Sequence, residues 1–169
     1  GTDTTAVGAS GTLGWTSPFF KFGEQIFWQD FNFEIDKKFS KKLKGTFTYM
    51  YQSYDIATLE GHTGEPTVYA NIGVIDMTYK FTSRHALRWE LQGLWTKEDK
   101  GDWAALLLEY TISPHWFVSL ANQYNYGNPD EDMQINYYTG SFGYTHETTR
   151  ISVTYGRQRE GIVCVGGVC

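Results

Sequence analysis

The feature that most constrains this chain is a repeat of two in residues 73–95, where apolar and polar side chains alternate along two stretches. A polar turn at 82–85 separates the stretches, and Leu94 is the exception to the alternation. The apolar positions are Ile75, Met77, Tyr79, Phe81, Leu87, Trp89, Leu91 and Trp95. Because successive side chains of a strand point to opposite faces, this pattern predicts an antiparallel hairpin with one apolar and one polar face.

The same alternation recurs on both sides of this hairpin. It predicts further strands at 25–36, 43–55, 103–112, 116–126, 134–146 and 150–160. The connections at 37–42, 82–85, 113–115 and 147–149 are short, whereas those at 56–67, 97–102 and 127–133 are longer and richer in Gly, Asp and Glu. Bacterial outer-membrane barrels have this asymmetry of tight periplasmic turns and longer external loops. We therefore predict an all-β, antiparallel up-and-down transmembrane β-barrel with about eight strands in this chain.

Three segments follow from this interpretation. Residues 1–24 form a loop or the remnant of a preceding strand, 25–160 form the barrel meander, and 161–169 form an external hairpin. With the short turns in the periplasm, the first strand enters from outside and the eighth leaves to the outside. A single-chain barrel normally closes with both ends in the periplasm, so we expect these strands to be part of a larger barrel.

Composition separates the candidate classes. Aromatic residues make up 17% of the 169 residues, which suits the two interfaces of a membrane. The net charge is −5 and the basic residues do not form one long face, so we expect no nucleic-acid partner. No apolar run approaches the ~18 residues of a transmembrane helix. The mean hydropathy of −0.41 is compatible with a barrel, whose strands hide half their side chains from lipid.

The alternative is a soluble lipocalin-like barrel that turns the apolar face inward. Long strands, scarce lysine within strands and aromatic residues near strand ends all favour the membrane barrel. The aromatic residues toward the long loops are Trp28, Tyr51, Tyr69, Trp95, Trp103, Tyr124, Tyr126 and Tyr138. Those toward the short turns are Tyr79, Phe81, Trp89, Tyr110, Trp116 and Tyr144. The outward positions named above carry no charge, and Arg157, which would break that rule, we place near the outer end of the eighth strand.

Charged residues of the strands fall on the predicted lumen face. They are Asp30, Glu34, Asp36, Asp76, Lys80, Arg88, Glu90, Glu109 and Arg150. Paired carboxylates can serve acid–base chemistry or hold a cation, but we favour an ion-paired polar wall. His85, His115 and His146 lie at short turns without metal-ligand spacing, and no nucleotide or hydrolase motif occurs. We therefore expect no catalytic residues, no cofactor, no metal and no enzymatic activity.

Two further local signals stand out. Five lysines lie within residues 37–44, either as a solvated turn or as a surface for anionic headgroups or a protein partner. Cys164 and Cys169 flank Val165-Gly166-Gly167-Val168, and the Gly-Gly pair suits a two-residue hairpin turn. That turn would set the two cysteines directly opposite each other, so we predict an external disulfide.

Several motifs of the C-terminal half resemble an uncharacterised family of outer-membrane β-barrels from Bacteroidota. They are residues 116–130, 144–151 and, above all, the run GRQREGIVCVGGVC at 156–169. The resemblance implies a Gram-negative outer-membrane location and a chain that continues into further strands. It implies no activity, so no catalytic residues are carried over.

Two membrane roles remain open, with a soluble ligand binder as the third interpretation. The first, which we favour, is a structural or accessory subunit of an outer-membrane complex, in contact with lipid or lipopolysaccharide and with other outer-membrane proteins. The second is a porin-like channel for small solutes, whose selectivity would depend on the lumen charges. Bilayer conductance distinguishes these two roles, and extraction without detergent would support the soluble binder.

Overall fold

A computed structural model describes residues 28–56 and 66–159 of the chain. The predicted segments 1–24 and 161–169, with Cys164 and Cys169, lie outside the described residues. Eight strands account for most of the described chain. They are β1 (Trp28–Lys38), β2 (Leu43–Asp55), β3 (Thr67–Lys80), β4 (His85–Trp95), β5 (Trp103–Ile112), β6 (Trp116–Tyr124), β7 (Asn136–His146) and β8 (Thr149–Gly156).

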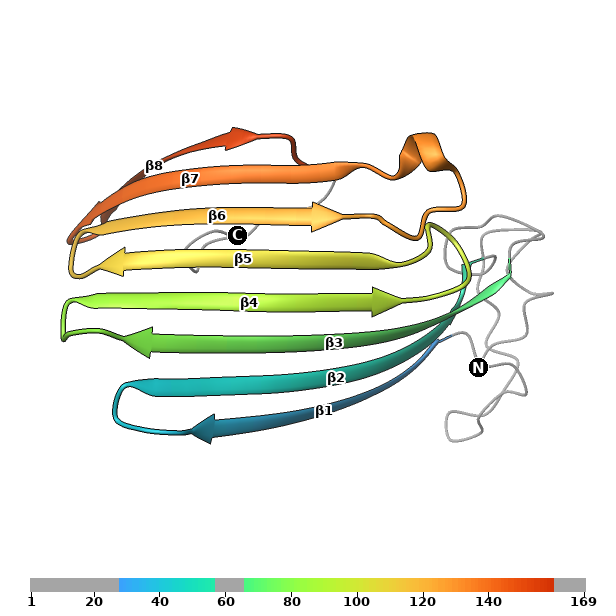
Figure 1. The fold of residues 1–169 in the computed structure, drawn as a ribbon, viewed down its shortest axis with the longest axis horizontal. Helices are drawn as coiled ribbons and strands as arrows, with labels where there is room; N and C mark the ends of the chain where they lie inside the picture. Colours follow the sequence, from blue (N-terminus) through green and yellow to red (C-terminus); the bar gives the residue numbers. More distant parts are fainter. Residues whose placement is uncertain (1–27, 57–65, 160–169) are drawn as a thin grey trace, which may run out of the picture.

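The strands form one antiparallel sheet in sequence order, from β1 at one edge to β8 at the other. The short turns gather at one end of the sheet and the long loops at the other (Figure 1). A short 3-10 helix, η2 (Glu131–Met133), lies in the loop between β6 and β7. Among the described residues, no helix is long and apolar enough to cross a membrane. The predicted all-β, antiparallel up-and-down arrangement is thus confirmed.

Several strand boundaries differ by one or two residues from those predicted, and two differ by four residues or more. β3 begins at Thr67, six residues before the predicted start at 73, and pairs with β2 from its first residue. β8 ends at Gly156 rather than at 160. The backbone of Gly156 has φ 145°, and a Cβ there would collide with the carbonyl of Tyr138. Only glycine can therefore end the strand in this conformation.

The strand register assigns every strand side chain to one of two faces. Directly opposed residues of an antiparallel pair project to the same side of the sheet. The apolar face can be followed from β1 to β7 through the opposed residues Ile35, Phe47, Ile75, Leu91, Leu106, Asn122 and Tyr138. On the same face, the row of Val118, Phe142 and Val153 continues it to β8. Its charged side chains within the described strands are Lys37 and Asp55, each at or beside a strand end. In β5, Leu106 opposes Leu91 and so lies on the apolar face.

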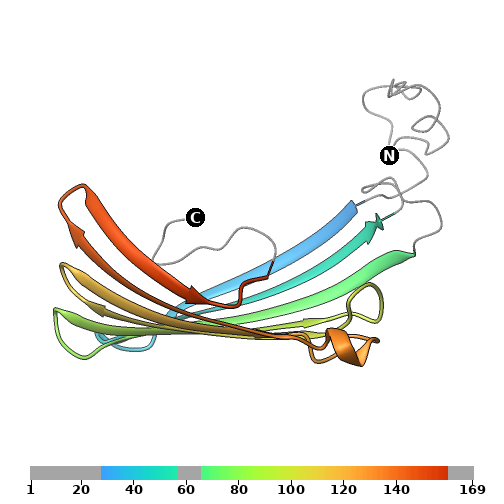
Figure 2. The same cartoon turned by 90° about the horizontal axis from the view of Figure 1, so that it is seen from above.

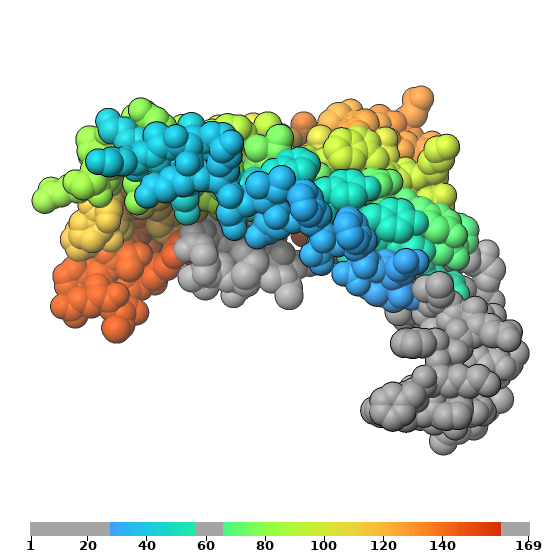
Figure 3. Space-filling view, turned by 90° about the horizontal axis from the view of Figure 1, so that it is seen from below, coloured from blue at the N-terminus to red at the C-terminus, as the bar shows by residue number. Residues whose placement is uncertain are grey.

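The sheet is bent so that β1 and β8 rise to the same side (Figure 2), and the curvature is also visible in the space-filling view (Figure 3). Exposure identifies the polar face as the concave one. In β6, Leu120 on the apolar face is 59% exposed, whereas Phe117 and Ser119 on the polar face are 6% and 4% exposed. Side chains inside a bend converge and shield one another, while those outside it spread apart. The apolar face is therefore convex and open.

The long loops between β4 and β5 and between β6 and β7 touch through two glycines. The N–H of Gly127 donates to the carbonyl of Asp102 at 3.1 Å. Gly101 has φ 70°, and a Cβ there would collide with the carbonyl oxygen of Gly127. This contact fixes two neighbouring loops at the same end of the sheet.

We expect Gly101→Ala to lower the free energy of unfolding by about 1–3 kcal/mol, because alanine is strained at this φ and its Cβ meets backbone. Denaturant unfolding with tryptophan fluorescence measures the loss. The matched control is Gly140→Ala in β7, whose Cβ would meet only Leu120 Cδ2 at 3.5 Å, an ordinary contact. Equal stability of the two variants would show that the loops do not depend on this contact.

Candidate functional site

The concave polar face carries the charged residues that the sequence singled out. The register places all nine of them on this face. Asp30, Glu34 and Asp36 project from β1, and Asp76 and Lys80 project from β3. Arg88 and Glu90 lie on β4, Glu109 on β5 and Arg150 on β8. The period of two groups those that share a strand, because they are an even number of residues apart. The register then places Glu109 opposite Arg88 and Arg150 opposite Thr145 on the same face.

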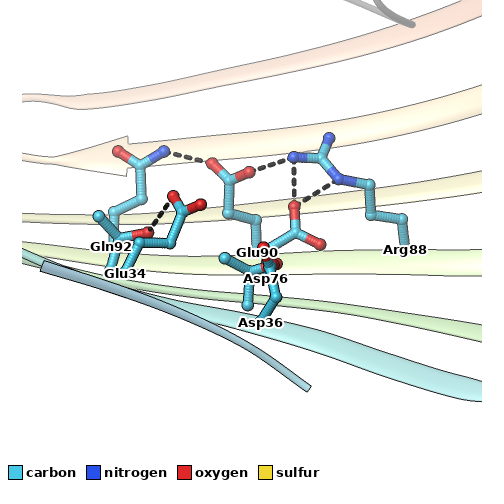
Figure 4. Close-up of polar contacts among 8 residues, drawn as sticks. Glu34, Asp36, Asp76, Arg88, Glu90 and Gln92 are labelled. Carbon is cyan, nitrogen blue, oxygen red and sulfur yellow. Dashed lines mark hydrogen bonds and ion pairs between the residues drawn. The ribbon is translucent and has the colours of Figure 1, made fainter. Parts of the chain in front are cut away.

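An ion-paired network at the centre of this face joins β3 to β4 (Figure 4). Arg88 Nε donates to Asp76 Oδ2 at 2.6 Å, and its Nη2 donates to Glu90 Oε2. Gln92 Nε2 donates to the other oxygen of Glu90. The side chains of Asp76 and Glu90 are only 26% and 14% exposed, so the guanidinium neutralises two shielded carboxylates. Asp76, Arg88 and Glu90 thus form one ion-paired cluster on the polar face.

Two carboxylates of β1 accept hydrogen bonds from hydroxyl groups of β2. Thr46 Oγ1 donates to Asp36 Oδ1 at 2.5 Å, and Thr48 Oγ1 donates to Glu34 Oε2 at 3.2 Å. The network and these two bonds cross-link β1 with β2 and β3 with β4 on the concave side. At the other edge, the guanidinium of Arg150 lies over the ring of Phe117, 4.1 Å from its centroid.

An aromatic and arginine cluster near the long loops was missed by sequence reasoning. Trp103 and Tyr137 stack with their centroids 6.1 Å apart on the polar face. After β8 the chain turns inward, which brings Arg157 over Tyr137 and Arg159 over Trp103. The prediction that Arg157 lies on the lipid face is therefore wrong, because Gly156 ends the strand one residue earlier. The glycine itself was the available signal.

The aromatic residues of the two bands are not confined to one face of the sheet. Trp28 and Trp103 lie on the polar face, where Trp28 stacks on Tyr54 and Trp103 stacks on Tyr137. The other strand residues of the two bands lie on the apolar face, where the ring of Trp116 packs against Phe142 and Tyr144. A period of two separates the faces, but a position near a strand end does not by itself specify an interface residue.

The histidines of the short-turn end do not form a metal site. His115 and His146 stack at 5.7 Å, and His85 Nδ1 bonds to the hydroxyl of Tyr110 at 2.9 Å. Within residues 28–56 and 66–159, no group of three or more His, Cys, Asp or Glu side chains is placed to hold a metal ion.

Glu98 joins the β4–β5 loop to β3 at the long-loop end. Desolvation raises the pKa of its carboxyl, but hydrogen bonds from the Tyr69 N–H and from the Thr96 hydroxyl and nearby backbone outweigh it. The net result is a pKa below the usual range of glutamate, so the carboxylate is charged at neutral pH. The bonds therefore persist through mild acid and are lost as the pH falls through this lowered pKa.

The fold and this face define a class of protein: an all-β antiparallel meander with an open apolar convex face and an ion-paired polar concave face. The family model for the Family of unknown function (DUF6029) matches residues 3–169. The chain belongs to this family. No curated protein and no solved structure matches the chain.

Proposed function

We propose that this chain forms the wall of a bacterial outer-membrane β-barrel and serves as a structural or accessory subunit of an outer-membrane complex. The observation that carries the proposal is the convex apolar face, which is open along all eight strands. Large side chains on it remain widely exposed, among them Phe31, Leu91, Leu120, Phe142 and Val153. A soluble domain rarely leaves so continuous an apolar face in water, whereas lipid covers it without cost.

The distribution of charge supports the same placement. Lys or Arg at the bilayer midplane costs about 2–4 kcal/mol, and the cost falls toward zero near the interfaces. The charged side chains of the apolar face are Lys37 and Asp55, at the two ends of the strands. Asn71 lies further in, but its Oδ1 accepts a hydrogen bond from the Tyr49 hydroxyl at 2.6 Å, which compensates for its desolvation.

The concave face favours the structural role over the channel. Its central charges are engaged within the sheet, because Arg88 binds Asp76 and Glu90, and threonines bind Glu34 and Asp36. Such a network stiffens a wall and leaves few charges available to a passing solute. The chain after β8 also turns over the concave face at Arg157 and Arg159. A porin-like channel remains the second candidate, since the polar concave face would line its lumen.

Fractionation and electrical recording test these roles. We expect the protein to sediment with outer membranes, to require detergent for extraction and to migrate differently on gels with and without heating. Extraction in buffer alone would overturn the barrel and favour a soluble ligand binder. Planar-bilayer recording separates the two membrane roles: large, ion-selective steps would favour the channel and count against the accessory subunit.

A further inference from the structure

The turn between β1 and β2 concentrates positive charge. Lys37, Lys38, Lys41, Lys42 and Lys44 are all exposed, and residues 37–45 contain no carboxylate. Within residues 28–56 and 66–159, none of these lysines takes part in an ion pair. The hairpin forms one corner of the short-turn end of the sheet (Figures 1 and 3).

Two of these lysines oppose each other at the cost of stability. Lys38 and Lys44 are directly opposed on the polar face. Like charges at such positions repel, and a pairing of Lys with Glu there would be favourable instead. These two lysines add to the positive charge of the turn from the polar face, whereas Lys37 lies on the apolar face.

The turn is held in one shape rather than left flexible. The N–H groups of Phe39 and Ser40 both donate to the carbonyl of Leu43, at 2.9 and 3.1 Å. Ser40 Oγ accepts from the N–H groups of Lys42 and Leu43. The carbonyl of Lys42 accepts from the N–H of Lys80 in β3, 2.8 Å away. The lysines therefore project from a fixed backbone.

Aromatic rings at the same corner of the sheet indicate which kind of anion the turn binds. Lys37 lies on the apolar face, and its Nζ lies 5.4 Å from the centre of the Phe39 ring. Phe39 borders Gly45 and Met77 of the apolar face, and both Phe39 and Phe81 are about half exposed. Exposed aromatic rings beside lysines, at the end of a lipid-facing surface, match the headgroup region of a bilayer.

We propose that the β1–β2 turn is a binding site for anionic phospholipid headgroups, a proposal that rests on the membrane placement above. With the short turns in the periplasm, the lipids would be those of the inner leaflet. Several lysine ammonium groups would surround the phosphate of a headgroup. The rings of Phe39 and Phe81 would lie beside them in the interfacial region of the bilayer. Each lysine near an anionic surface adds about 1 kcal/mol, which is roughly a fivefold gain in partitioning.

The test uses the full chain with vesicles of phosphatidylcholine, alone or mixed with phosphatidylglycerol, and measures association by sedimentation. We expect K37Q/K41Q to weaken association with the mixed vesicles by on the order of 25-fold at low salt, with a smaller loss at high salt. Association with phosphatidylcholine alone should not change. The matched control is K97Q/K100Q, which removes two positive charges at the long-loop end and should have little effect.

Other outcomes would overturn the proposal. Equal losses in the two variants, or none in K37Q/K41Q, would show that this turn is not a lipid site. Displacement by inorganic phosphate would identify a site for free phosphate instead. Protease protection in the same samples tests the barrel separately from the lipid site. If the protein inserts into the vesicles but its association does not depend on phosphatidylglycerol, the lipid site is overturned and the barrel is not. If the protein binds the mixed vesicles without inserting, the barrel is overturned and the lipid site is not.

Discussion

We expect Leu91→Lys to lower the free energy of unfolding from vesicles by about 2–4 kcal/mol, the cost of a cation at the bilayer midplane. Leu91 lies in the middle of β4 on the convex apolar face and is 44% exposed in the isolated chain. In a membrane this side chain faces hydrocarbon. In a protein that folds in water, the same substitution at such an exposed site would change stability by only about 0.5 kcal/mol. Urea unfolding of the vesicle-inserted protein measures the effect.

The neighbouring residue provides the matched control. Gln92 follows Leu91 in β4, is also exposed and lies on the polar face, beside Glu90. We expect Gln92→Lys to fold into vesicles nearly as well as the unaltered protein, because the new ammonium group faces the polar side and a carboxylate. Equal behaviour of Leu91→Lys and Gln92→Lys would show that the two faces do not differ in surroundings and would exclude the membrane placement.

The second large effect is expected for Arg88→Gln, which removes the cation between Asp76 and Glu90. Leaving a fully buried charge unpaired costs about 3–5 kcal/mol. The Arg88 side chain is 35% exposed, so solvent screening reduces the expected loss to roughly 1–3 kcal/mol. The loss is measured by urea unfolding in the same vesicles.

A second variant distinguishes lost pairing from a general defect. We expect R88Q/D76N to recover about half of the loss or more, because one of the two unpaired carboxylates is then neutral. Failure of the double variant to recover any stability would mean that Arg88 acts through packing alone. Unchanged stability in Arg88→Gln itself would remove the main support for a structural concave wall.

The placement of Arg88 between Asp76 and Glu90 also bears on the channel alternative. If the channel is the correct role, Arg88→Gln should alter ion selectivity as well as stability, because two carboxylates would then face the lumen unneutralised. In the structural role, stability changes while conductance stays absent. Recording from the same variant therefore tests both interpretations of the polar face.

The strand order and the two faces were predictable because they depend on local geometry. A period of two assigned Leu91 to one face and Glu90 to the other without any knowledge of their neighbours, and β2 and β5 begin and end where the pattern begins and ends. The grouping of the charged residues that share a strand follows from the same rule.

What lies near the strand ends was not predictable in this way. The predicted strand continues through Arg157, yet Gly156 turns the chain inward, and Trp103 stacks on Tyr137 from a strand two positions away. These contacts depend on the curvature of the sheet and on the positions of elements that are distant in sequence.

The sequence by itself determined the all-β meander, its loop asymmetry and which side chains share a face, because strand periodicity is a property of neighbouring residues. Only the tertiary structure decided which face is concave, which carboxylates Arg88 binds, and that the chain after β8 lies over the polar face. The physical reason is that curvature and cross-strand contacts arise from the register and twist of all the strands together.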